Sequence, residues 1–198
     1  MTAKFAQLLA LAGAVTLSVS CGDLVRQGRS PVMLVIESLE VTNGNTLLSD
    51  VANTTDTPCS PSTPCVFNDM ATATMRIQMK DQGSLNVVAT PSLVNEVTIT
   101  RYRVEYRRTD GRATPGVDVP YGFDSALTIT INGDSTDASF QLVRHAAKEE
   151  APLRALLLNR DIISTIATVT FYGHDQAGNE VSASGNIGID FGDFADGN

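Results

Sequence analysis

Tryptophan is absent from this chain of 198 residues, and the other aromatic residues, 4 Tyr and 7 Phe, make up only 6% of it. Sugar-binding platforms usually present exposed aromatic rings, so this composition weighs against a glycan-binding module. Positive charge is also scarce, because 14 Lys and Arg stand against 22 Asp and Glu and give a net charge of −8. Such a chain repels the phosphate backbone of nucleic acids, and we expect no nucleic-acid partner.

Catalytic motifs are missing as well. The only histidines are His145 and His174, and no Gly-x-Ser-x-Gly elbow, His-Glu-x-x-His helix or phosphate-binding glycine loop occurs. Strand parity places His174 on the outward side of its strand, and His145 lies at a strand end. We therefore predict no enzyme, no catalytic residue and no cofactor. A hydrolase whose site forms only in three dimensions stays a competing hypothesis.

Acidic residues form two small groups. Asp134 and Asp137 lie in a turn, and Asp190, Asp193 and Asp196 recur at every third position near the end of the chain. Calcium takes roughly six to eight oxygen ligands from a tight loop, and neither group has the spacing of an EF-hand. Turn chemistry explains the first group and a solvated tail the second, so the sequence predicts no metal site.

The chain has three cysteines, and the first follows a leader typical of exported proteins. Lys4 precedes an uncharged run, residues 5–20, that is rich in Leu, Ala and Val and too short for a membrane span of about 20 residues. This leader and Cys21 resemble the lipobox region of bacterial lipoproteins, with Ser18 where the family usually has Leu. The resemblance implies that residues 1–20 are a signal peptide and that signal peptidase II cuts before Cys21, which carries a diacylglyceryl group.

The same resemblance gives a location. Two or more acyl chains on Cys21 would hold the protein on a membrane of the bacterial cell envelope, with residues 21–31 as lipidated terminus and tether. In Gram-negative relatives an Asp after the cysteine retains the protein on the inner membrane, and here that position is Gly22, which favours the outer membrane. An ordinary signal peptide that is cut near the same position is the alternative.

Cys59 and Cys65 remain as a pair in a proline-rich segment. Export places them in an oxidising compartment, so we predict a disulfide that pins one short loop. The chain-entropy estimate for so short a loop is about 2 kcal/mol. A metal site is the alternative, but it needs more Cys or His ligands at close spacing than this segment has.

Beyond residue 31 the dominant pattern is an alternation of apolar and polar residues, which predicts strands with one buried face. An apolar run at 32–41 and six alternating stretches give about seven strands, separated by clusters of Gly, Pro, Asp and Asn. The alternating apolar positions are Met75, Ile77 and Met79; Tyr102, Val104 and Tyr106; Leu127, Ile129 and Ile131; Phe140 and Leu142; Ala167, Val169 and Phe171; and Val181, Ala183, Ile187 and Ile189.

These strands predict an all-β protein: an antiparallel two-sheet sandwich over residues 32–191, followed by an acidic tail at 192–198. The stretch from His145 to Asn159 breaks the alternation and is rich in Ala, Leu, Glu and Lys. It predicts one short helix between the fifth and sixth strands, which Pro152 either opens or splits.

Two stretches carry a second resemblance, and they cover about a fifth of the chain. Residues 99–106 resemble the third strand of fibronectin type III and related immunoglobulin-like modules. Residues 169–179, with their Asp-Gln-Ala-Gly-Asn turn, resemble the sixth strand and the hairpin that follows it. The resemblance implies an immunoglobulin-like sandwich. Without Trp and paired inter-sheet cysteines, the antibody type of domain does not fit, and such a fold does not specify a function.

Six residues are candidates for contact with a partner. Arginines on and beside one strand could dock an acidic partner, although a solvated strand face neutralised by neighbouring acids is the alternative. Two aromatic residues end a long loop at 109–124, where they could bind a partner or cover the core. The candidates are Arg101, Arg103, Arg107 and Arg108 on the strand, and Tyr121 and Phe123 in the loop.

We therefore expect a non-catalytic, lipid-anchored envelope protein that acts as an interaction or scaffold module for a membrane-associated protein complex. Its partners would be the membrane, through the N-terminal lipid, and a protein. A surface adhesion or glycan-binding module is the alternative.

Overall fold

A computed structural model of the protein describes residues 28–194 except 43, 45, 56, 57, 61, 85 and 86. The expected signal peptide at 1–20, the lipidation site Cys21 and the tail residues 195–198, with Asp196, lie outside the described residues. Most of the described chain is β-strand, as an all-β protein requires. Within this part of the chain no helix is both long and apolar enough to cross a membrane.

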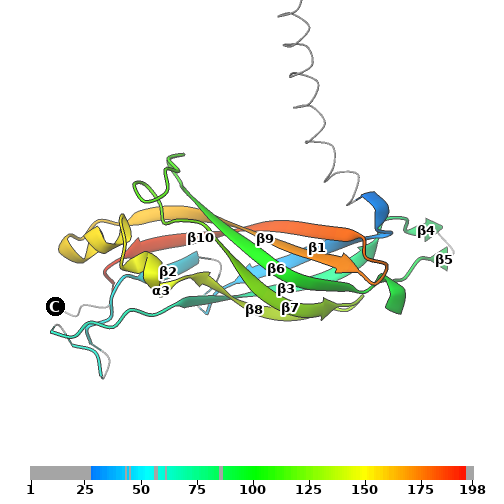
Figure 1. Ribbon diagram of the computed structural model, residues 1–198, viewed down its shortest axis with the longest axis horizontal. Helices are drawn as coiled ribbons and strands as arrows, with labels where there is room; N and C mark the ends of the chain where they lie inside the picture. Colours follow the sequence, from blue (N-terminus) through cyan, green and yellow to red (C-terminus); the bar gives the residue numbers. More distant parts are fainter. Residues whose placement is uncertain are drawn as a thin grey trace, which may run out of the picture.

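Two sheets build the body of the molecule, and a small separate hairpin projects from one end (Figure 1). The three-stranded sheet has the order β1 (Val32–Glu40), β3 (Asp69–Met79), β8 (Thr136–Val143). The five-stranded sheet has the order β2 (Thr46–Asp50), β10 (Glu180–Gly192), β9 (Ile163–Asp175), β6 (Val97–Arg108), β7 (Phe123–Ile131). The hairpin consists of β4 (Gly83–Ser84) and β5 (Val87–Val88).

One strand pair departs from the expected antiparallel arrangement. All pairs in the two sheets are antiparallel except β2 with β10, where Ile189 lies opposite Leu47 in a parallel register. The chain leaves the three-stranded sheet after β1, and Val41 and Gly44 exchange two backbone hydrogen bonds of 3.0 Å in the turn that follows. It then continues in the same direction on the other sheet, which makes β2 parallel to β10. With only five residues, β2 has too short an alternation to be recognised in the sequence.

The core lies between the sheets and consists of the inward positions that the alternation predicts. Met75 and Ile77 of β3, Phe140 of β8 and Phe171 of β9 are at most 2% exposed. Each large apolar side chain that is fully buried contributes about 1.5–3 kcal/mol. Phe140 and Phe171, from opposite sheets, meet edge to face with their ring centroids 5.4 Å apart, so the two sheets interlock rather than merely face each other.

Two tyrosines of β6 also cross the core and bond to the backbone of β8. The Tyr102 hydroxyl donates to the Gln141 carbonyl and accepts from the Gln141 N–H, both at 3.1 Å. The Tyr106 hydroxyl donates to the Leu142 carbonyl at 2.6 Å. Burial raises the pKa of Tyr106, so this phenol stays protonated and remains a donor.

The connection between β8 and β9 contains two short helical turns. They are the α-helix α3 (His145–Lys148) and the 3-10 helix η2 (Leu153–Leu158), and Pro152 directly precedes the second. Proline suits the start of a helix because its missing N–H would have no partner there. A third turn, η1 (Leu93–Asn95), lies between the small hairpin and β6.

The β9–β10 turn is held by one buried carboxylate, Asp175, which is 1% exposed. It accepts the Ala177 N–H at 3.0 Å, the Asn179 N–H at 2.8 Å and the Asn179 side-chain amide at 2.9 Å. Burial by itself would raise the pKa of Asp175, but the hydrogen bonds from Asn179, Ser30 and Ala177 outweigh it and hold that pKa below its usual value. The bond from Ser30 ties the start of β1 to this turn.

Replacing this carboxylate gives a pH-dependent prediction. Asp175→Ala removes several charge-assisted hydrogen bonds and should lower the free energy of unfolding at pH 7 by about 2–3 kcal/mol. Because the folded-state pKa is depressed, this stability is present at neutral pH and is lost as the pH falls from about 4 through the folded-state pKa.

Denaturant unfolding between pH 2 and 8 measures the effect, with the exposed neighbour change Gln176→Ala as control. The two variants should differ at pH 7 and converge in acid. A constant difference across the whole pH range would contradict this role of Asp175.

Candidate interaction surface at the loop end

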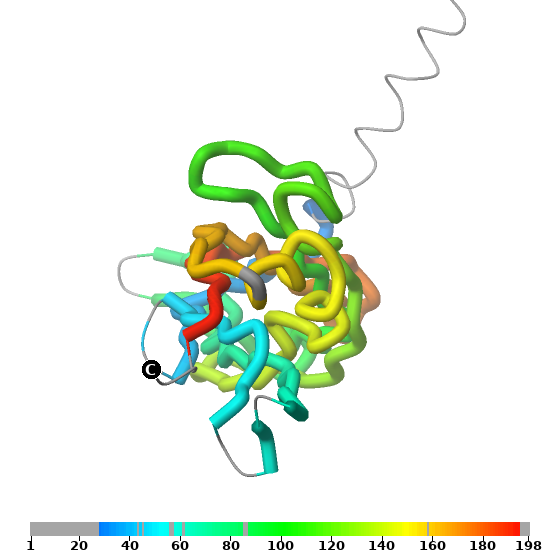
Figure 2. The backbone as a smooth tube through the Cα atoms, turned by 90° about the vertical axis from the view of Figure 1, so that its left-hand side faces the viewer, coloured from blue at the N-terminus to red at the C-terminus, as the bar shows by residue number. Residues whose placement is uncertain are grey.

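Three long connections meet at one end of the sandwich, which we call the loop end (Figure 2). They are the segments 51–68, 109–122 and 144–162. They meet because β2, β6 and β8 all finish at this end. The start of β1 lies at the opposite end, where the Lys80 N–H donates to the Pro31 carbonyl at 2.9 Å. The loop end is therefore the end of the sandwich opposite the start of β1.

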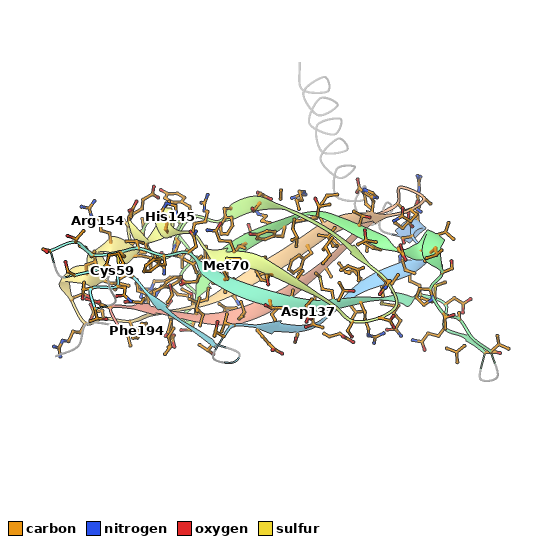
Figure 3. The ribbon with its side chains drawn as sticks, turned by 90° about the horizontal axis from the view of Figure 1, so that it is seen from below. Cys59, Met70, Asp137, His145, Arg154 and Phe194 are labelled. Carbon is orange, nitrogen blue, oxygen red and sulfur yellow. A yellow bond between two sulfur atoms is a disulfide. The ribbon has the colours of Figure 1, made fainter. Side chains whose placement is uncertain are left out.

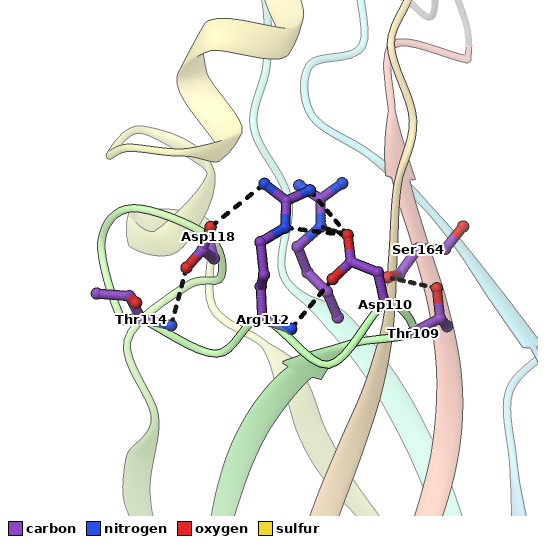
Figure 4. Close-up of polar contacts among 7 residues, drawn as sticks. Thr109, Asp110, Arg112, Thr114, Asp118 and Ser164 are labelled. Carbon is purple, nitrogen blue, oxygen red and sulfur yellow. Dashed lines mark hydrogen bonds and ion pairs between the residues drawn. The ribbon is translucent and has the colours of Figure 1, made fainter.

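Charged side chains give the 109–122 loop a defined shape (Figure 4). Asp110 accepts two bonds from the Arg112 guanidinium, at 3.0 and 2.8 Å, and Arg108 approaches the same carboxylate at 3.3 Å. The bond from the Arg112 side chain is the main reason why the pKa of Asp110 falls to about 2. Arg112 also reaches Asp118 at 3.6 Å, and Asp118 accepts the Thr114 N–H at 3.2 Å.

The two aromatic candidates of this loop have different environments. Tyr121 is 53% exposed and lies against Gly116, where a Cβ atom would come within 2.5 Å of the tyrosine hydroxyl. Phe123 is only 5% exposed, because it opens β7 on the inward side and packs edge to face on Tyr102. The Arg144 guanidinium lies over the Phe123 ring, 4.5 Å from the ring centroid. Tyr121 thus remains a surface candidate, whereas Phe123 is part of the core and is withdrawn as a contact residue.

The arginine candidates also divide into two groups. Arg101 and Arg103 lie in the middle of the outward sheet face and both pair with Asp124 of β7, at 3.0 and 2.7 Å. Arg103 also pairs with Glu105 at 3.0 Å, and the Arg101 guanidinium stacks on the Tyr172 ring, 3.7 Å from its centroid. Such exposed pairs contribute little stability, but they occupy the charges of these two arginines.

The remaining two arginines stand where β6 enters the loop end. Arg108 pairs with Asp110, and Arg107 is exposed. In the part of the chain that the structure describes, no acidic side chain forms an ion pair with Arg107. The structure therefore does not bring the four arginines together as one basic patch.

A groove of about 450 Å³ lies on the loop end between the 51–68 segment and the two helical turns. Val66 and Leu157 supply apolar walls, and Glu149, Glu150 and Arg154 supply charge. Figure 3 shows Arg154 and His145 at this end, together with Cys59 of the disulfide. Beside the groove Phe67 is 55% exposed. A lining that mixes apolar and charged side chains is compatible with the docking of a protein segment.

A buried lysine holds one wall of the groove in place. Lys148 is 2% exposed, and its Nζ donates to Asp69 Oδ1 at 3.0 Å and to the Asp50 carbonyl at 2.8 Å. Asp69 in turn accepts the Ser49 hydroxyl at 2.6 Å. This network fixes α3 to β2 and β3. The sequence does not mark Lys148 as a buried residue, because a lysine beside two glutamates at a helix end is typical of a solvated surface.

The disulfide between Cys59 and Cys65 holds the other wall, and the sequence-based prediction of this pair is confirmed. Their Cα atoms are 5.4 Å apart. Cys65 also exchanges two backbone hydrogen bonds with Asn53, at 2.8 and 2.9 Å. Val66 and Phe67 follow directly, so the bridge fixes the strip of chain that lines the groove.

The histidines and acidic groups of the sequence lie apart from one another. His145 bonds to Asn68 Oδ1 at the loop end, through its backbone N–H at 2.7 Å and its Nδ1 at 3.1 Å, whereas His174 lies at the far end of β9. Asp137 accepts the Thr74 hydroxyl at 2.7 Å. Among the described residues, no three His, Cys, Asp or Glu side chains gather as a metal ion would require.

Comparison with known proteins adds no assignment. No family model matches the chain, and no curated protein matches it. The candidate site thus stands on its geometry alone.

Substituting the buried lysine tests the support of the groove. Lys148→Met leaves the Asp69 carboxylate without its ionic partner and should lower the free energy of unfolding by about 3–5 kcal/mol. The exposed Lys80→Met is the matched control and should change it by no more than about 1 kcal/mol, the range of an exposed ion pair.

Equilibrium unfolding in urea measures both changes. The double variant Lys148→Met with Asp69→Leu should recover part of the loss, because it also removes the stranded charge. Equal effects of the Lys148 and Lys80 substitutions would contradict the role of this ion pair.

Proposed function

We propose that this protein is a non-catalytic, lipid-anchored module of the bacterial cell envelope that binds a protein partner through its loop end. One observation carries the proposal: the chain enters the sandwich at one end, and the groove lies at the other. A domain held by its N-terminus would present such an end to a partner. The 13-residue strands β9 and β10 separate the two ends by about 40 Å.

We further propose that the sandwich is immunoglobulin-like, and its strand order supports this. β10, β9, β6 and β7 follow one another as strands G, F, C and C′ do in a variable-type domain. β1, β3 and β8 correspond to strands A, B and E of the facing sheet. The stretches that resemble the third and sixth strands of these modules fall in β6 and β9, which are neighbours.

Exposed apolar side chains support the loop end as the binding surface. Phe67, Val117, Tyr121, Leu157 and Ile162 are between 40% and 68% exposed. They come from all three connections, whereas the outward face of the five-stranded sheet is rich in Thr and Ser. Apolar groups that remain exposed on a well-packed fold mark interaction sites. The ion pairs of the 109–122 loop keep Val117 and Tyr121 in fixed positions, which lowers the entropic cost of binding.

The anchor itself has a direct test. Cys21→Ser removes the thiol that lipid attachment requires, so the variant should leave the membrane fraction, whereas the unchanged chain should partition into detergent and carry the mass of a diacylglyceryl group. Fractionation of bacterial cells with mass spectrometry measures both. An unmodified Cys21 in the exported wild-type chain would overturn the lipoprotein assignment.

Photo-crosslinking in intact cells tests the binding surface. A photoreactive residue in place of Phe67 or Tyr121 should give one discrete protein adduct, and one in place of Thr128, exposed on the outward face of β7, should give none. Leu157→Ser, introduced into the same chains, should reduce the adduct. Adducts from Thr128 alone would place the partner on the sheet. Glycan recovered from Phe67 and Tyr121 instead of protein would favour the adhesion alternative.

A further inference from the structure

Four aliphatic side chains stand exposed at the end opposite the groove, and we call them the apolar rim. Val87 and Val88 of β5 are 71% and 70% exposed, and Leu93 and Val94 of η1 are 79% and 67% exposed. These are among the most exposed apolar residues of the described chain. Their number at one end is unusual for a surface that faces only water.

The hairpin that carries two of them is built to stand away from the sandwich. Gly83 has a φ of +78°, and a Cβ atom there would lie 2.3 Å from the Val87 carbonyl oxygen. Asp81 accepts the Gly83 N–H at 2.9 Å, and the Ala89 N–H donates to the Gln82 carbonyl at 3.0 Å. A glycine, an aspartate and backbone bonds thus fix a hairpin that holds its valines in solvent.

The chain enters the sandwich directly beside this hairpin. Val32 lies opposite Met79 in the β1–β3 register, and the Lys80 N–H bonds to the Pro31 carbonyl. Ten residues lead from Cys21 to Pro31 and can span at most about 35 Å. If Cys21 carries lipid, the apolar rim therefore lies at the end of the domain that the anchor keeps closer to the bilayer.

We propose that the apolar rim inserts into the lipid surface that the Cys21 anchor binds, so that the domain stands with its loop end away from the membrane. This inference rests on the proposed lipid anchor. The rim side chains are all aliphatic, whereas protein-binding hot spots favour Trp, Tyr and Arg. Asp81 and Glu96 border the rim together with Lys80 and Arg29, so the charges there balance, and insertion is hydrophobic and does not require anionic lipid.

Lipid quenching of single-cysteine reporters tests the orientation. The full acylated chain, with Val88→Cys or Leu93→Cys labelled by a fluorophore, is reconstituted into phosphatidylcholine vesicles that contain doxyl-labelled lipid. Val117→Cys is the matched control, because this loop-end valine is 68% exposed, close to the 70% of Val88. The native disulfide protects Cys59 and Cys65 from the label. Quenching at positions 88 and 93 should exceed that at position 117 several-fold and should not increase with anionic lipid.

Flotation and the mass of Cys21 are measured on the same samples, so that the two proposals can fail separately. A chain that floats with the vesicles but shows equal quenching at all three positions overturns the rim insertion and leaves the anchor intact. Crosslinking of two copies at position 88, without quenching, would make the rim a contact between copies and also overturns it. A chain with unmodified Cys21 that does not float overturns the anchor and the orientation together.

Discussion

The Tyr102 and Tyr106 hydroxyls are the contacts on which the arrangement of the two sheets depends. Apolar packing holds the sheets together but does not by itself fix how one is placed over the other. Each hydroxyl crosses from β6 to the backbone of β8, so a displacement of one sheet over the other would break these buried hydrogen bonds. Three aromatic rings, Phe123, Phe140 and Phe171, pack around Tyr102, with centroid distances of 5.3–6.2 Å. The Tyr102 side chain therefore combines specific hydrogen bonds to the facing sheet with the burial of an aromatic ring.

That fixed frame keeps the two ends of the molecule apart. On the outward face of the long sheet, Thr168 bonds to Asn186 at 2.8 Å and the Thr170 hydroxyl lies 2.9 Å from that of Ser184. These side chains satisfy each other's hydrogen-bonding groups across neighbouring strands, and the middle of the sheet is therefore polar. The exposed apolar groups of the two proposals lie beyond the strand ends, where loops can hold them without weakening the core. The surface proposed to contact lipid and the surface proposed to bind a protein thus lie at opposite ends of the strands.

The core could be predicted from the sequence, whereas the loops could not. Strict alternation placed Met75, Ile77, Val104 and Val169 inside, and all four are buried, because the direction of a side chain in a strand depends on parity alone. Strand β2 and the β4–β5 hairpin were missed, since five and two residues are too few to show a period. Lys148 was missed for a different reason. Its burial depends on the carboxylate of Asp69, 79 positions away in the sequence. The residues around Lys148 do not indicate that this partner lies beside it in the fold.

The candidate arginines also show that local sequence does not reveal partners from other strands. Counting charges along β6 suggested a basic strip, but Asp124 of the neighbouring strand neutralises its centre. At the loop end Arg108 and Arg112 meet Asp110 and Asp118, two positive charges against two negative ones. Such a network produces little electrostatic attraction for a distant partner. The fields of opposite charges so close together cancel within a few ångströms. What the loop end offers is shape: apolar side chains and a groove held at fixed positions by ion pairs, a disulfide and a buried lysine. Affinity at such a surface would come mainly from close packing.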